Sequence, residues 1–396
     1  MNNVPEIRFE GFDGVWEQRK LGEVAEFNPR SILPDSFEYV DLESVFGTSL
    51  ISHRTENKET APSRAQRLAK KGDVFFQTVR PYQKNNFLFN LSFDNFVFST
   101  GYAQLRPNID SNYLLCLLQE EKFVTKVIDN CTGTSYPAIN STTLAGVEVC
   151  VTLDTSEQTT IGNFFRTLDE ALALCKRKLE GLKELKRGYS QLMFPQAGES
   201  VPRVRFAGFA GEWAETKLGE MLTERDEMLE ESVEYPLMSF VGNVGVVPKS
   251  EQYDRSFLVK GDDKKYKRTE INDFIYSSNN LETGSIGFNK TGKAVISPVY
   301  SIFYSNNYSE SLFIGLLSKR KDFINKMIHF RQGVMYGQWR IHERDFLNIT
   351  VLTPSAVEQN KIIHFFRNLD EQIIAQQSKW DKLQQLKAAY LQKMFV

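Results

Sequence analysis

The chain has 396 residues, a formal net charge of −2, 41% hydrophobic residues and 25% charged residues. These values are typical of folded globular domains and exclude a disordered tail or a mini-protein. The sequence holds no run of about eighteen apolar residues that could span a membrane, and its start lacks the basic and apolar segments of a secretory signal. We therefore expect a cytoplasmic protein of two or more domains with no membrane association.

The residue types that usually carry metal binding and catalysis are scattered. Cys116, Cys131, Cys150 and Cys175 include no CxxC pair and have no histidine at zinc-ligand spacing, which predicts reduced packing thiols. The sequence also lacks a Gly-rich methyl-donor loop, an Asn-Pro-Pro-aromatic motif and a Ser/His/Asp arrangement. We therefore expect no metal, no cofactor and no catalytic residue in this chain.

The first recognisable segment returns about two hundred residues later. Residues 5–23 and 202–220 are identical at 11 of 19 aligned positions, at a constant offset of 197. Both copies contain the pattern RFxGFxGxW, called here the GFxGxW element. Its glycines suit turns, and its large side chains are predicted to be buried anchors, with a partner-docking surface as the alternative. These side chains are Phe9, Phe12, Trp16, Phe206, Phe209 and Trp213.

Two basic windows follow in matching places of the two halves. Residues 54–71 and 255–268 each hold six basic and two acidic side chains. The slightly negative total charge does not indicate a nucleic-acid-binding protein, but local Lys and Arg clusters can contact phosphates. Apolar, β-branched and aromatic runs beyond the windows predict strands. The runs cover residues 71–78, 95–100, 272–278 and 293–297.

Each half then continues with one helix and one loop. Residues 112–128 and 310–328 have apolar side chains at spacings of three and four, which predicts one helix in each half. Polar loops with glycine and aromatic residues follow at 132–137 and 331–340. Strands with a helix among them favour α+β domains.

Each half closes with a long helix. Residues 157–194 and 358–395 are identical at 17 of 38 positions, at an offset of 201. Apolar residues at alternating steps of four and three predict a coiled-coil seam about 55 Å long. Ser156 with Glu157, and Ser355 with Glu358, suit helix N-termini. The predicted seam consists of Ile161, Phe165, Leu168, Leu172, Leu179, Leu182, Tyr189, Ile362, Phe366, Leu369, Ile373, Trp380, Leu383 and Tyr390.

The duplication predicts how the chain is organised. Because each helix ends where the next globule begins, the simplest arrangement is an antiparallel helix pair with pseudo-twofold symmetry. The alternative is that the seams mediate homo-oligomers. We therefore predict an α+β protein with two globular domains, 1–155 and 198–355, and two spacer helices, 156–197 and 356–396.

Two stretches imitate catalytic motifs. Residues 287–293 match a phosphate-binding P-loop, but Ala294 replaces the required Ser or Thr, and a strand is predicted where the loop needs a helix. Asp35, Glu56 and Lys58 imitate a metal-dependent nuclease, but that chemistry needs the Glu and Lys on one strand and their surroundings are polar and unpatterned. We interpret both as chance matches and keep a self-contained metal-dependent nuclease as an alternative function.

In combination, the repeated GFxGxW element, the repeated EQxxIxxFFRxLDE helix start and the differing segments between them resemble the specificity subunits of type I restriction-modification systems. The resemblance covers essentially the whole chain. It implies two target recognition domains that each read one half of a split double-stranded DNA sequence. It also implies helices that dock two modification subunits and, through them, restriction subunits. Adenine-N6 methylation with S-adenosylmethionine, and ATP- and Mg-dependent translocation and cleavage, would then belong to those partners.

A protein that recognises a split DNA sequence needs basic side chains to contact phosphates. It also needs amide, Arg and aromatic side chains to contact bases. In the first domain the candidates are Arg64, Arg67, Lys70, Lys71, Arg80, Tyr82, Lys84, Asn85, Asn86, Thr134, Ser135 and Tyr136. In the second domain they are Lys264, Lys265, Lys267, Arg268, Asn279, Asn280, Arg331, Gln332, Tyr336, Gln338 and Arg340. Residues 77–80 differ from residues 277–280, which predicts unlike half-sites and an asymmetric target. A coiled-coil scaffold that binds no DNA is the remaining alternative.

Overall fold

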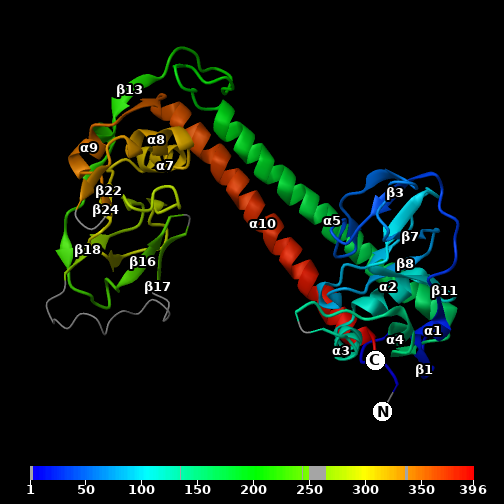
Figure 1. Cartoon of the computed structure of the whole chain (residues 1–396). Coiled ribbons are helices and arrows are strands. Elements are labelled where there is room, and N and C mark those ends of the chain that lie inside the picture. Colours follow the sequence, from blue (N-terminus) through cyan, green and yellow to red (C-terminus); the bar gives the residue numbers. More distant parts are fainter. Residues whose placement is uncertain (1–2, 134, 243, 249–264, 335–337) are drawn as a thin grey trace. The chain divides into compact units, whose positions relative to one another are not determined.

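The chain divides into two units in the computed structural model (Figure 1). Unit 1 consists of Met1–Lys178 and Gln376–Val396, and unit 2 consists of Leu179–Ala375. Each unit therefore contains one globule, the start of one long helix and the end of the other. The structure describes residues 3–133, 135–242, 244–248, 265–334 and 338–396.

An antiparallel sheet with the strand order β2-β11-β8-β9 lies at the centre of unit 1. Every residue of β8 is buried, because Val74 and Phe76 belong to one hydrophobic cluster while Phe75 packs into another. A strand that is covered on both faces has a continuous run of apolar residues, and this pattern predicted β8. The strands span Ala25–Phe27 (β2), Tyr102–Pro107 (β11), Val74–Gln77 (β8) and Phe87–Leu88 (β9).

A second sheet of unit 1 has the order β6-β3-β10-β7, in which β3 and β10 run parallel. The expectation of unpatterned chain around Glu56 is wrong, because these polar residues form the edge strand β6, where one side faces solvent. Glu56 accepts a hydrogen bond from Arg54 Nε at 2.8 Å, so its carboxylate is already paired. The strands span Arg54–Asn57 (β6), Ser36–Val40 (β3), Phe96–Ser99 (β10) and Ala65–Leu68 (β7).

Unit 2 repeats the central sheet with the order β14-β22-β19-β20. These strands span Thr223–Glu224, Ser301–Tyr304, Phe274–Tyr276 and Ile286–Phe288. Its second sheet, β15-β18-β21, spans Met228–Leu229, Tyr266–Thr269 and Ala294–Ile296, and a hairpin pairs β16 (Met238–Val241) with β17 (Gly245–Pro248). Strand β21 begins at Ala294, where a P-loop would need a helix, so the rejection of that motif is confirmed.

Each unit carries two short helices where the sequence predicted one. The predicted helix 112–128 is interrupted at Glu120, whose backbone is extended and whose buried carboxylate accepts a hydrogen bond from the Phe123 amide at 2.8 Å. Arg320, whose backbone is also extended but whose side chain makes no capping hydrogen bond, interrupts the predicted helix 310–328. The apolar spacing continues through both breaks, so periodicity does not reveal them. The helices span Ser111–Gln119 (α2), Glu121–Asp129 (α3), Tyr308–Leu317 (α7) and Lys321–Ile328 (α8).

Short elements connect each GFxGxW element to the chain that precedes a long helix. Strand β1 (Glu17–Lys20) pairs antiparallel with β12 (Glu148–Val151), and β13 (Ala214–Lys217) pairs in the same way with β25 (Thr350–Thr353). The remaining elements are α1 (Leu21–Val24), β4 (Val45–Phe46), β5 (Ser49–Leu50), the 3₁₀ turn η1 (Pro81–Gln83), α4 (Ser141–Ala145), α6 (Leu218–Met221), β23 (Gln332–Val334), β24 (Gln338–Arg340) and α9 (Glu343–Leu347).

The long helices α5 (Thr155–Leu192) and α10 (Ala356–Met394) pack together within each unit. In unit 1 the rings of Phe164 and Tyr390 lie 5.0 Å apart between centroids, and in unit 2 the rings of Phe365 and Tyr189 lie 4.9 Å apart. The start of each helix therefore lies beside the end of the other, and the predicted antiparallel arrangement is confirmed.

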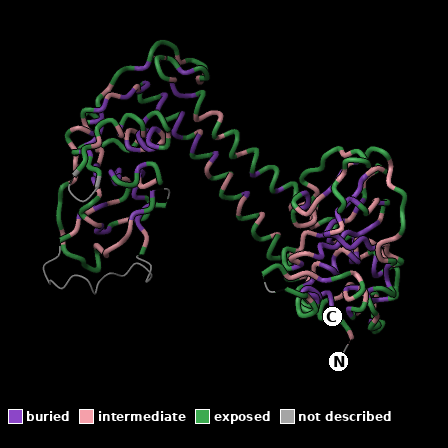
Figure 2. Tube along the Cα trace, viewed as in Figure 1, coloured by how far each residue is buried: buried purple, intermediate pink, exposed green. Residues whose placement is uncertain are grey.

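The seam follows the predicted heptad spacing. Every predicted seam position is buried or half-buried, and Figure 2 shows buried and exposed positions alternating along both helices. Lys387 pairs with Asp169 in unit 1, and Lys186 pairs with Asp370 in unit 2. Gln376 occupies one core position and donates a hydrogen bond to the carbonyl of Cys175 at 3.1 Å.

The two repeated segments of unit 1 are joined by a buried ion pair. Arg8 of the GFxGxW element donates two hydrogen bonds to the Glu157 carboxylate of α5, at 2.6 and 2.8 Å, and a third to the carbonyl of Gly14 at 2.5 Å. The Glu157 side chain is fully buried, and the hydrogen bonds from Arg8 hold the carboxylate in place. Trp16 is buried next to it, as predicted for an anchor, and donates to Glu157 at 3.3 Å.

Unit 2 contains the same joint. Arg205 donates to Glu358 at 2.6 and 2.8 Å and to Gly211 at 2.5 Å. The predicted N-terminal residues behave differently at the two helix starts. Ser355 Oγ accepts from the Glu358 amide at 3.4 Å, but the residue that caps α5 is Asp154, not Ser156.

No helix within the described parts of the chain combines the length and apolar character needed to cross a bilayer. The four-part domain division drawn from the sequence stays a prediction.

Candidate nucleic-acid interface

In unit 1 the structure brings together two loops that the sequence analysis selected separately. One follows β8 and contains Arg80, and the other precedes α4 and contains Tyr136. The amide of Arg80 donates to the carbonyl of Pro137 at 2.7 Å, and the amide of Ile139 donates to the carbonyl of Thr78 at 3.0 Å. The Arg80 guanidinium lies 4.4 Å from the centroid of the Tyr136 ring, which is a cation–π contact.

The backbone around this contact is unusual. Arg80 and Lys84 flank the turn η1 with φ values of 54° and 55°. Non-glycine residues rarely occupy this left-handed region, which costs about 1 kcal/mol or more per residue. Backbone strain of this kind gathers at functional sites, and here it fixes the direction of the Arg80 side chain.

A pocket of about 390 Å³ opens between these loops and the β4–β5 hairpin. Arg80, Tyr136 and Asn85, all candidates from the sequence, line it. Gln77 and Phe46 line it too, and the sequence analysis missed both. A polar residue at the end of an otherwise apolar strand was the available signal for Gln77, whereas nothing in the sequence places Phe46 beside Tyr136.

The other candidates in unit 1 differ in how far their side chains are exposed. Asn86 is buried and accepts a hydrogen bond from the Gln77 amide at 2.9 Å, and its role in DNA binding stays a prediction. Lys84 is held by the carbonyl of Gln119 at 3.0 Å and by Glu121 at 2.6 Å. Burial lowers the pKa of the half-buried Arg67. The exposed candidates are Arg64, Lys70, Lys71, Tyr82 and Ser135, and Thr134 lies outside the described residues.

Unit 2 also brings its selected loops together. The amide of Trp339 donates to Asn279 Oδ1 at 2.6 Å, and the amide of Ile341 donates to Ser278 Oγ at 2.9 Å. The loop after the central strand thus meets the loop before the last short helix, as in unit 1. The contacts come from side chains here, whereas backbone groups make them in unit 1.

Most basic candidates of unit 2 are neutralised. Arg331 forms a bidentate pair with Glu282, at 2.7 and 2.8 Å, and these hydrogen bonds lower the pKa of that carboxyl. Arg268 is paired with Glu270 and Glu227, and hydrogen bonds to these two carboxylates raise its pKa. The assignment of Lys267 is wrong, because it is buried near Asp226 and Glu343. Lys265, Asn280, Gln332 and Arg340 are exposed, whereas Lys264, Tyr336 and the side chain of Gln338 lie outside the described residues.

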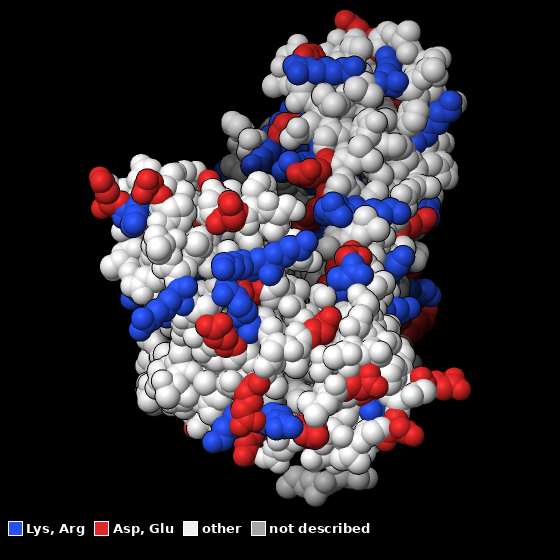
Figure 3. Space-filling view, turned by 90° about the vertical axis from the view of Figure 1, so that its right-hand side faces the viewer, with Lys and Arg blue, Asp and Glu red and all other residues white. Residues whose placement is uncertain are grey.

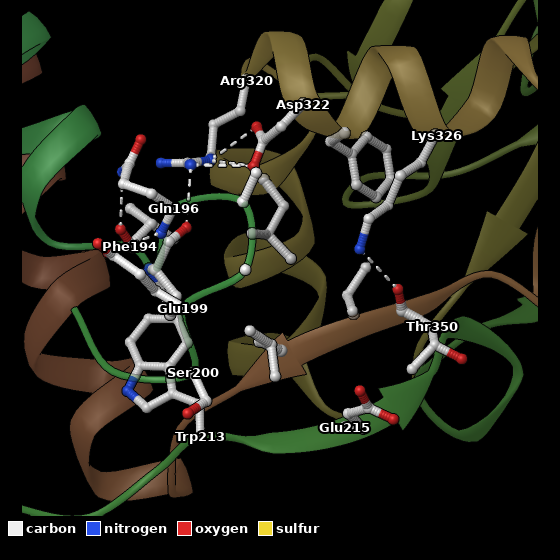
Figure 4. A pocket seen from close by; sticks show the side chains of 17 residues that line it. Phe194, Gln196, Glu199, Ser200, Trp213, Glu215, Arg320, Asp322, Lys326 and Thr350 are labelled. Atoms are coloured by element: carbon white, nitrogen blue, oxygen red, sulfur yellow. Dashed lines mark hydrogen bonds and ion pairs between the residues drawn. The ribbon is translucent and has the colours of Figure 1, made fainter.

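A pocket of about 580 Å³ lies in unit 2 where the chain leaves α5 (Figure 4). Arg320 lines it, lies over the Phe194 ring, pairs with Asp322 at 2.9 Å and donates to the carbonyl of Ser190 at 2.6 Å. Lys326 donates to the carbonyl of Thr350 at 3.2 Å. These groups hold the segment between the two halves in place, and they form no nucleophile–base pair.

The surface charge is mixed. Figure 3 shows Lys and Arg interspersed with Asp and Glu over the face turned to the viewer. Within the described residues no group of three or more His, Cys, Asp or Glu side chains is arranged to hold a metal ion. The candidate interface is therefore identified by the side chains of the loops that meet in each unit, and not by a broad basic surface.

Residues 14–184, which span the globule of unit 1 and the start of α5, match the family described as the type I restriction modification DNA specificity domain. This part of the chain is therefore similar to that specificity domain. The resemblance stated from the repeated motifs is thereby confirmed. The specificity subunit of the type I restriction enzyme HindI from Haemophilus influenzae is 20% identical to it over 167 residues, which cover 40% of this chain and 36% of that protein. The matched region thus spans about a third of that relative.

Solved structures share the fold of this chain along nearly its whole length. The type I restriction-modification S subunit from M. genitalium has a TM-score of 0.64 at 16% identity, with 99% of each chain covered. A chain from a study of complex assembly and conformational transition of the type I R-M system has a TM-score of 0.54 at 20% identity, with 96% of this chain and 97% of that chain covered. The predicted α+β fold with two globular domains and two long helices is confirmed.

Proposed function

We propose that the chain is the DNA-reading subunit of a type I restriction-modification complex and that each unit reads one half of a bipartite target. The observation that carries the proposal is the meeting of two separate loops at the end of the central strand in each unit. Such loops, held by a buried sheet, can present Arg, amide and aromatic side chains to base edges. Their residues differ between units, which supports an asymmetric target.

The partners follow from the same proposal. Two modification subunits would dock on the long helices, bind S-adenosylmethionine and methylate adenine N6. Restriction subunits, using ATP and Mg, would join through them. The specificity chain would itself be non-catalytic, would act in the cytoplasm and would bind DNA weakly alone, because its net charge is −2 and Lys84, Arg268 and Arg331 are paired with carboxylates.

The test exchanges residues 30–150 with those of a related chain of different specificity. We expect the methylated sequence to change in one half only, as read by mapping methylated adenines in cells that carry the hybrid. Exchange of the segment 225–340 serves as the matched variant and should change the other half. A hybrid that methylates an unaltered target would contradict the proposal.

A further inference from the structure

The concave pocket in unit 1 has a lining suited to a planar heteroaromatic group. Tyr136 is 64% exposed, and the Arg80 guanidinium lies 4.4 Å from the centroid of its ring. Phe46, 66% exposed, lines the same pocket, and the Gln77 and Asn85 amides add hydrogen-bonding groups. Nucleobases bind single-strand-binding proteins through this combination of stacking and cationic side chains.

One polar atom of a residue that lines this pocket has no hydrogen-bond partner among the described residues. Gln77 is 2% exposed, and its Nε2 donates to the carbonyl of Val79 at 2.6 Å and to Gln83 Oε1 at 2.8 Å. These two bonds fix the amide orientation, and Oε1 is left buried without a hydrogen bond. A buried unpaired acceptor is unfavourable, so a ligand with an N–H group would relieve it.

The shape of the pocket decides which part of DNA could fill it. In an intact duplex the base edges lie at the floor of a groove, where protruding side chains reach them. A recess in the protein can be filled only by a group that protrudes from the duplex. Phosphates fit poorly, because Arg80 is the one cation in the lining and Glu43 is also present.

We propose that this pocket receives one base of the first half-site, swung out of the duplex, stacked on the face of the Tyr136 ring that Arg80 leaves uncovered and read by the amide of Gln77. The inference rests on the proposed function, because it needs target DNA against unit 1. Unstacking a base costs a few kcal/mol, and stacking on the exposed aromatic ring offsets that cost.

The experiment uses the full chain assembled with its modification subunits and the target found by methylation mapping. 2-Aminopurine, whose fluorescence rises when it leaves the base stack, replaces each position of the first half-site in turn. We expect a several-fold rise at one position other than the methylated adenine. Tyr136→Ala should abolish that rise and weaken binding about tenfold to a hundredfold, whereas Tyr136→Phe, which keeps the ring, should retain both.

Phe93→Ala is the matched control, since Phe93 is an equally exposed aromatic residue of unit 1 that does not line the pocket. It should leave the signal unchanged. Specific binding without a rise, or with a rise only at methylated adenines, overturns the inference and leaves the proposed function intact. Loss of subunit assembly in Tyr136→Ala would identify a protein-docking site and also overturns it. A complex with no sequence preference contradicts the proposed function itself.

Discussion

The two units share an Arg–Glu ion pair where their sequences repeat, and they make different contacts where the sequences differ. Arg8, Glu157 and Gly14 in unit 1 match Arg205, Glu358 and Gly211 in unit 2 at the same distances. The recognition loops share only their location. Duplication has therefore preserved the residues that must fit one another, and it has left free those that face outward.

The central sheets show an intermediate case. Asp73 and Asp273 are both buried ahead of the central strand, and each forms a bidentate pair with an arginine. Arg106 of β11 supplies it in unit 1, whereas Arg225, which follows β14, supplies it in unit 2. A buried carboxylate needs a cation, but the strand that provides the cation can change.

Breaking the joint between the repeats should have the largest effect. Arg8→Met leaves Glu157 buried without its cation, so we expect a loss of about 3–5 kcal/mol in the free energy of unfolding of unit 1. Arg205→Met should destabilise unit 2 equally. Hydrogen exchange of β8 and β19 reports on each unit separately. Arg203→Met, at an exposed pair, is the control. Unequal losses would show that the joints are not equivalent.

The aligned positions Gly162 and Ile363 differ, and alanine should destabilise each unit for a different reason. Ile363 is buried in the core of unit 2, so Ile363→Ala should cost about 2–5 kcal/mol. Its counterpart Gly162 has no room, because an added Cβ would lie 2.7 Å from Asp110 Oδ1 and 2.9 Å from the Tyr113 amide. Gly162→Ala should therefore cost about 1–3 kcal/mol. Urea unfolding measures both, and a stabilised Gly162→Ala variant would contradict the close approach.

The buried carboxylate of unit 2 should show a pH signature. Burial raises the pKa of Asp273 above its usual 3.8, and hydrogen bonds from Arg225 oppose the rise. Because the folded state then holds a proton that the unfolded state releases, stability falls as pH rises from the unfolded pKa to the folded pKa. Arg225→Met removes the opposing cation, so the fall should extend to higher pH, with a slope of up to about 1.4 kcal/mol per pH unit. Urea midpoints between about pH 4 and 7 test this. The exposed Arg344→Met variant should follow the unmodified protein.

The helix–helix ion pairs should have the smallest effects. Their coupling energies should be about 0.2–1 kcal/mol, the range of partly exposed pairs. Lys387–Asp169 should exceed Lys186–Asp370, because the side chains are 17% and 29% exposed in the first pair and 24% and 42% in the second. Double-mutant cycles with Met and Asn replacements measure each coupling. The reverse order would mean that exposure does not set their strength.

The site was predicted in part. Arg80 and Tyr136 were selected because polar and aromatic residues in loops favour recognition, and the structure places them in contact. Asn86 carries the same kind of side chain as Asn85, yet it is buried under η1 while Asn85 lines the pocket. Which of two neighbouring residues points inward in an irregular turn depends on backbone angles that have no period in the sequence.

The sequence by itself determined the duplication, the heptad seam, the buried central strands and the family resemblance, because repeats and periodic burial are recorded residue by residue along the chain. Only the tertiary structure decided that Arg8 reaches Glu157, that Glu120 divides a continuous apolar pattern into two helices and that β6 is a strand. These outcomes depend on which surfaces meet after folding. Ion pairs, interruptions of helices and edge strands depend on residues that are distant in sequence, and local sequence patterns do not encode them.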